Sequence, residues 1–158
     1  MRTLALFAAA CVVVGTAGCV RVQRDPATGN ADIDVESPLK RGEDWNGNVT
    51  GRGTFAGVSG TVRAVVDGGN TTTTIRLSGL PPGGHYPWHL HEGTCETGGP
   101  IFGDPNAYTP LHVGDDGRAE GTARLVNLKL NESRKYHANV HASASNMGTI
   151  IACGNVTD

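Results

Sequence analysis

Apolar and polar residues alternate along most of the chain after residue 45, and this pattern predicts β-strands. Residues 60–67 place Val62, Ala64 and Val66 on one face, because successive side chains of a strand point to opposite sides. An Asp-Gly-Gly-Asn turn follows, and residues 71–77 return with the same alternation. The two runs therefore predict a β-hairpin.

Further strands are predicted at 118–126, 136–142 and 149–156. Residues 93–111 are rich in Gly and Pro and have no period, which is typical of a functional loop in a compact domain. No convincing helical stripe is present, and a composition with 23 glycines and 5% aromatic residues also favours short strands and turns. We expect an all-β domain, a sandwich or flattened barrel with one functional loop.

The first 18 residues are typical of an exported protein. Arg2 precedes an apolar core from Leu4 to Val14, which is too short to span a bilayer. Thr16-Ala17-Gly18-Cys19 then resembles a bacterial lipobox, in which the cysteine carries lipid and begins the mature protein. The alternative is ordinary signal-peptidase cleavage after Ala17 or Gly18. The lipobox interpretation predicts an extracytoplasmic protein, anchored through Cys19 to the periplasmic or cell-surface side of a bacterial membrane.

Three segments follow from this interpretation: a signal peptide at 1–18, a flexible tether at 19–44 and a β-domain at 45–158. The tether mixes charged residues with Pro, Gly and Asn, and only Ile33 and Val35 alternate in a way that suits a short strand within 31–36. The formal charge of −2 has no basic excess, so we expect no nucleic-acid partner.

The four cysteines predict one disulfide. Cys11 is removed with the signal peptide and Cys19 carries lipid, which leaves Cys95 and Cys153 as a pair in an oxidising compartment. A bridge between them closes a loop of nearly 60 residues and contributes roughly 4 kcal/mol in the chain-entropy model.

Two histidines in Trp88-His89-Leu90-His91-Glu92 predict a metal site. On a strand, His89 and His91 lie on one face about 7 Å apart, and both imidazoles can reach one ion. The alternative is a polar strand face with two surface histidines. His141 lies twelve residues before Cys153, so the predicted disulfide would bring it towards the same region.

Residues 60–156 resemble the copper/zinc superoxide dismutase family, through five motifs in the family's order. The motifs are His89-Leu90-His91 for the copper pair, Cys95-Glu96-Thr97-Gly98-Gly99-Pro100 for the disulfide loop, His112-Val113-Gly114-Asp115 for a zinc histidine and the zinc aspartate, Val140-His141 for the third copper ligand, and Ala152-Cys153-Gly154 for the second disulfide cysteine. The resemblance implies a Greek-key β-barrel with copper on His89, His91 and His141. It also implies superoxide dismutation by alternate reduction and oxidation of that copper.

The chain departs from the family at two functional positions. Ile101 stands where the family has the histidine that bridges copper and zinc, and no histidine lies between Ile101 and His112. Ile150 replaces the arginine that attracts superoxide. The resemblance is therefore to a divergent, copper-only branch, and we expect copper as the cofactor and zinc to be unlikely.

The other candidate ligands have structural alternatives. His112 and Asp115 form either the remnant of a zinc site or a hydrogen-bonded loop. We expect His85 and His137 to be exposed to solvent, with either one able to supply a fourth ligand if a loop folds over the site.

Three function classes remain open at this point. A superoxide dismutase is favoured, with superoxide as substrate and membrane attachment through Cys19. The alternative is a non-catalytic lipoprotein of the same fold that binds or buffers copper ions, and a third class is a barrel whose histidines bind nothing. The sequence leaves the oligomeric state open.

Overall fold

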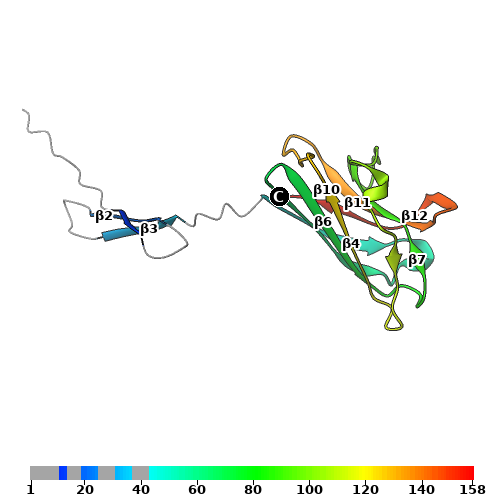
Figure 1. Ribbon diagram of the computed structural model, residues 1–158. Coiled ribbons are helices and arrows are strands. Elements are labelled where there is room, and N and C mark those ends of the chain that lie inside the picture. The colour runs from blue at the N-terminus through cyan, green and yellow to red at the C-terminus, as the bar shows by residue number, and fades with distance from the viewer. Residues whose placement is uncertain (1–10, 14–18, 25–30, 37–42) are drawn as a thin grey trace, which may run out of the picture. The chain divides into compact units, whose positions relative to one another are not determined.

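The computed structural model of the protein describes residues 11–13, 19–24, 31–36 and 43–158, and the chain divides into two compact units, Met1–Arg41 and Gly42–Asp158 (Figure 1). Most of the predicted signal peptide and lipobox lies outside these described residues. Within them, no helix has the length and apolar character that crossing a membrane requires.

The first unit contains a small antiparallel sheet with the strand order β1-β2-β3. Its strands are β1 at Cys11–Val13, β2 at Cys19–Arg24 and β3 at Ala31–Glu36. Strand β3 coincides with the short strand that the alternation of Ile33 and Val35 indicates, whereas β2 lies in the stretch whose composition predicts a tether. Lipidation of Cys19, the first residue of β2, stays a prediction.

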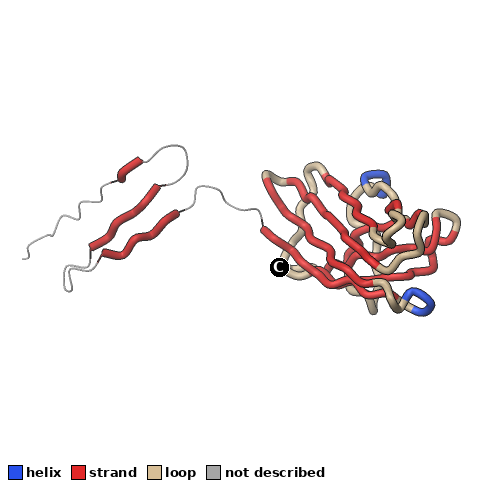
Figure 2. Tube along the Cα trace, turned by 90° about the horizontal axis from the view of Figure 1, so that it is seen from below, coloured by secondary structure: helices blue, strands red, loops and turns tan. Residues whose placement is uncertain are grey.

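The second unit is all-β and is built on one curled antiparallel sheet that forms a half-barrel (Figures 1 and 2). The strand order in this sheet is β10-β6-β5-β4-β12-β11-β8, and β7 pairs separately with β9. The strands are β4 Glu43–Gly51, β5 Ser59–Asp67, β6 Asn70–Ser78, β7 His85–Tyr86, β8 Trp88–Glu92, β9 Leu111–His112, β10 Ala119–Leu125, β11 Tyr136–Ser143 and β12 Asn146–Val156, and two 3-10 turns lie at Gly53–Phe55 and Pro105–Ala107. The prediction of an all-β domain is confirmed.

The predicted hairpin is the β5–β6 pair. Gly68 and Gly69 both have positive φ angles in the turn, which glycine adopts without steric cost. Val62 on β5 lies opposite Ile75 on β6, and both side chains are buried. The alternation in the sequence therefore gave the correct inward face of both strands.

Strands β8 and β10 lie at opposite edges of the sheet, although only the long loop and β9 separate them in the chain. The fully buried Trp88 side chain helps to connect these edges. A Cβ atom on Gly121 of β10 would lie 2.7 Å from the Trp88 indole nitrogen, so glycine is required for this close approach. The same nitrogen donates a hydrogen bond to the Thr109 carbonyl at 3.0 Å. The sheet curls around a core to which Trp88 contributes, and its edge strand β8 carries the candidate site.

Candidate metal centre

Strand β8 places two histidines on one face and apolar side chains on the other. Trp88 and Leu90 have no exposed surface and point into the core, while His89 and His91 are 6% and 7% exposed on the opposite face. The strand alternation that the sequence predicts is therefore present. Both histidine residues are therefore buried.

Strand β11 brings the third histidine to this face. Asn139 lies opposite His89, and the register changes at a β-bulge between Val140 and His141. The His141 backbone N–H then donates to the Pro87 carbonyl at 2.8 Å, which fixes this residue beside the start of β8. The ring of His141 lies 5.3 Å from that of His89 and 5.9 Å from that of His91, measured between centroids.

The three histidines form a group that could hold one metal ion, because one nitrogen from each ring lies within 4.8 Å of the others. Among the residues that the structure describes, this is the only such group of three or more His, Cys, Asp or Glu side chains. The predicted association of His89, His91 and His141 is therefore present. We call these residues the histidine triad.

Two backbone carbonyls orient rings of the triad. The Nδ1 atom of His91 lies 2.9 Å from the Gly99 carbonyl, and that of His141 lies 2.6 Å from the Met147 carbonyl. A carbonyl can only accept, so each Nδ1 carries the proton and each Nε2 keeps its lone pair. This carbonyl contact on the second nitrogen is the arrangement that metal-binding histidines usually show.

The His91 Nε2 atom supports metal binding more directly. It is buried and has no hydrogen-bond partner, a state that costs about 1–3 kcal/mol for an uncharged polar group. The Nδ1 atom of His89 lies 3.3 Å from the His141 Nε2 atom, so His89 donates this proton when no ion is present. An ion would replace that proton and would satisfy the His91 nitrogen as well. The donor set therefore fits a metal ion bound through Nδ1 of His89 and Nε2 of His91 and His141.

The electrostatic environment keeps the triad uncharged. The pKa of His89 is lowered from 6.5 to about 4, mainly by burial and to a smaller extent by the neighbouring His141 and His91. Burial also lowers the pKa values of His91 and His141, although the carbonyls of Gly99 and Met147 act in the opposite direction. Neutral imidazole is the form that binds metals. The triad is therefore ready to bind an ion at neutral pH.

We expect the metal-free protein to lose stability as the pH falls from about 6.5 to about 4. In this range the unfolded chain protonates His89 and the folded chain does not, so protons favour unfolding; above pH 6.5 the contribution is fully present. The shift of His89 alone corresponds to about 3 kcal/mol. Urea unfolding at several pH values measures it, with His89→Gln as the control that should reduce the slope, while His91 and His141 still contribute. If stability changed with pH equally in the two proteins, His89 would not be the source of the pH dependence.

The long loop covers the free edge of β8 and supplies the Gly99 carbonyl. Glu92 donates its backbone N–H to the Pro100 carbonyl at 3.0 Å, and Phe102 donates to Leu90 at 2.8 Å. Ile101 consequently forms an isolated bridge with His91. The position for which the resemblance implies a bridging histidine thus lies beside a triad residue, and an apolar side chain occupies it.

A disulfide fixes the start of this loop to β12. Cys95 and Cys153 are bonded, with their Cα atoms 6.0 Å apart, as the cysteine count predicts. The Cys95 backbone N–H also donates to the Asn155 side chain at 2.8 Å, and Arg52 donates to the Cys95 carbonyl at 3.2 Å. The disulfide and these two contacts hold the segment that leads to Gly99.

An aromatic side chain from the same loop packs on the triad. The Tyr108 ring lies 5.3 Å from that of His89 in an edge-on arrangement. Its hydroxyl donates to the Phe102 carbonyl at 2.6 Å, and burial raises the pKa of this hydroxyl. Tyr108 is therefore a neutral side chain that restricts the rotation of His89.

The expectation that His137 is exposed is wrong. This side chain has no exposed surface, stacks on the His91 ring at 5.2 Å, and accepts a hydrogen bond from the Asn139 amide at 3.2 Å. Residues 137, 139 and 141 share one face of β11. The pairing of β11 with β8 places His137 opposite His91 on this face. The alternation was visible in the sequence, but the pairing partner that buries His137 was not.

The other candidate ligands do not join the triad. His112 is exposed and its ring lies 4.2 Å from that of His85, which is exposed as predicted. His112 and Asp115 do not form a metal-binding group of three or more ligands within the described part of the chain. The structure therefore places His112 next to a histidine that the resemblance does not include.

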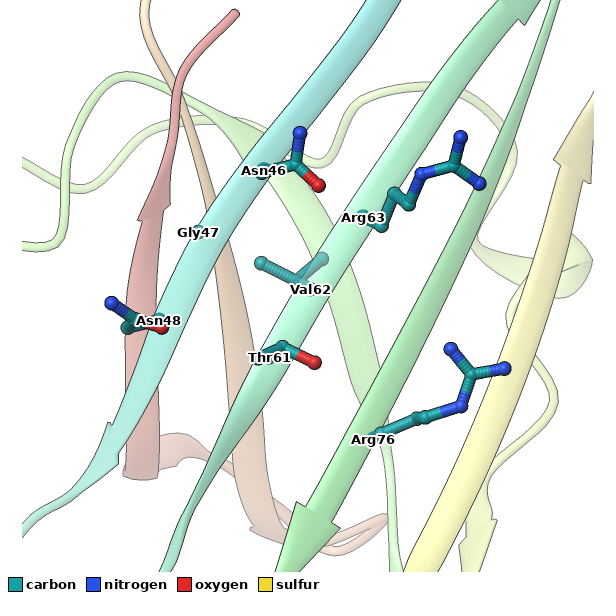
Figure 3. Close-up of a pocket in the computed structure, with 7 residues that line it drawn as sticks. All are labelled: Asn46, Gly47, Asn48, Thr61, Val62, Arg63 and Arg76. Carbon is teal, nitrogen blue, oxygen red and sulfur yellow. The ribbon is translucent and has the colours of Figure 1, made fainter.

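A separate surface hollow of about 320 Å³ lies on the outer face of β4, β5 and β6 (Figure 3). The Arg63 and Arg76 side chains extend from neighbouring strands along it. Both cations are paired, Arg63 with Asp44 and Arg76 with Glu120. This hollow has no metal-ligating cluster, and its positive charge is balanced.

Comparisons with known proteins found no matching family model and no matching curated protein.

Proposed function

We propose that the protein is a copper-dependent superoxide dismutase of the cell envelope, with the histidine triad as its copper site. The observation that carries this proposal is the set of three neutral imidazoles with convergent nitrogens, one of them buried and unpartnered. Nitrogen donor sets bind Cu²⁺ more tightly than the other divalent first-row ions. The five sequence motifs support superoxide as the substrate.

The strand order supports the Greek-key barrel that we propose for the fold. Strand β12 lies beside β4, and the connections between β6, β8, β10 and β11 pass from one edge region of the sheet to the other. Such non-sequential neighbours are typical of Greek-key topology. The predicted signal peptide and Cys19 support our placement of the protein outside the cytoplasm on a lipid anchor.

Copper at the triad would supply one-electron chemistry, in which one superoxide is oxidised to dioxygen and a second, with two protons, is reduced to hydrogen peroxide. The Gly99 and Met147 carbonyls would hold the His91 and His141 nitrogens in place. Ile101 cannot supply a proton beside His91, so the two protons come from water.

Turnover is expected to depend weakly on salt, because Ile150 lies directly opposite His141 on β12 and offers no positive charge there. Ile150→Arg should raise the rate at low ionic strength by tenfold or more and should make it fall with added salt, since fixed charges steer anions. Thr149→Arg is a matched control, because adjacent strand residues face opposite sides of the sheet. Stopped-flow superoxide decay measures both. Equal effects of the two arginines would contradict the role of position 150.

The alternative function is copper binding without turnover. The apolar residues Ile101 and Ile150 beside the triad favour it, because neither attracts an anion nor transfers a proton. Superoxide decay with copper-loaded protein, in the presence of a chelator for free copper, separates the two functions. Activity no higher than that of the metal-free protein would leave only the binding function.

A further inference from the structure

A second pair of imidazoles lies on the small β7–β9 ribbon. His85 and His112 are direct cross-strand partners, and their ring centroids are 4.2 Å apart with the planes at 76°. Both side chains are exposed. Neither belongs to the histidine triad.

The backbone under this pair is held firmly. Gly83 donates to the Val113 carbonyl and Val113 donates to Gly84, each at 3.0 Å. The adjoining Tyr86 and Leu111 are buried in the core. The Cα positions of His85 and His112 are therefore fixed, while their exposed side chains can rotate.

An oxygen ligand is available beside His112. A hollow of about 240 Å³ beside His112 is also lined by Glu120, Arg76 and Arg118, and it provides room for water next to the imidazole. The Glu120 carboxylate pairs with Arg76 at 2.9 Å, and both side chains are more than half exposed. The pair is bidentate, because the Arg76 Nε also donates to Glu120, at 3.1 Å, so Arg76 holds this carboxylate. Water in the hollow is therefore the oxygen ligand that can complete a site on the imidazoles.

We propose that His85 and His112 form a second, solvent-exposed site for a divalent transition-metal ion. Imidazole suits Cu²⁺, Ni²⁺ and Zn²⁺, and Cu²⁺ binds most tightly among them. Small side-chain rotations bring the two rings from edge-on contact to a common ion, with water as the remaining ligands. The site does not use Asp115 and is independent of the triad. Because it has two imidazoles instead of three and is open to solvent, it binds more weakly than the triad.

Calorimetric titration of the full protein with Cu²⁺ tests this site. We expect two classes of site in the native protein, with the weaker class lost or weakened at least tenfold in both His85→Gln and His112→Gln. The His141→Ala variant should keep the weaker class and lose the tight one. Because His85 and His112 are exposed, their substitutions should leave the far-ultraviolet circular dichroism unchanged.

Paramagnetic broadening by Ni²⁺ gives a second readout, because the NMR signals of His85 and His112 should broaden first in the His141→Ala variant. A native protein with only the tight class of site, or a weak class that persists in both glutamine variants, would overturn the proposal. A native protein with only the weak class of site would instead contradict the proposed copper function and leave the second site in place.

Discussion

Replacement of His89 and His91 together by alanine is expected to abolish tight copper binding. The protein should otherwise retain about one copper per chain and little zinc after dialysis. Substitutions of residues that merely orient metal ligands already reduce affinity about 10- to 100-fold. Removal of two of three ligand nitrogens removes far more, because the remaining His141 can offer only one nitrogen. We therefore expect a loss well above 100-fold.

Elemental analysis after loading with both metals and dialysis measures this effect. His112→Ala is the matched control, since it removes an exposed histidine outside the triad and should leave the tightly held copper unchanged. Retention of a full equivalent of copper by the double variant would refute the site. A full equivalent of zinc beside copper in the native protein would show that the zinc expectation is wrong.

Replacement of both Cys95 and Cys153 by alanine is expected to cost roughly 4 kcal/mol of stability. The two residues are 58 apart in the sequence, so their bond closes a long loop and removes much of the freedom of the unfolded chain. Folded proteins are stable by only about 5–15 kcal/mol, so this is a large fraction of the total. Urea unfolding of the two proteins measures the difference.

The same double variant should bind copper about 10- to 100-fold more weakly. The disulfide holds the loop whose Gly99 carbonyl orients His91, and outer contacts of this kind have effects of that size. Thr97→Ser, an exposed substitution in the same loop that keeps the hydroxyl bonded to the Thr94 backbone N–H, is the control and should leave copper binding unchanged. Alkylation of denatured, unreduced protein should leave Cys95 and Cys153 unmodified. Modification of both cysteines would show that the bond is absent.

The sequence determined those features that depend on local alternation. The alternation of side chains along a strand placed Val62 and Ile75 in the core. The same alternation put His89 and His91 on one face of a strand. The cysteine count predicted the bond between Cys95 and Cys153. Each of these inferences needs only the geometry of a single strand or a short list of candidates.

Tertiary structure alone decided how separate strands align, because pairing register depends on contacts between residues far apart in the chain. The β8–β11 register and the bulge before His141 complete the triad, and the same register buries His137, which the sequence had suggested was exposed. The Gly99 and Met147 carbonyls could not be predicted, since every residue carries a carbonyl and only the fold selects which one meets an imidazole.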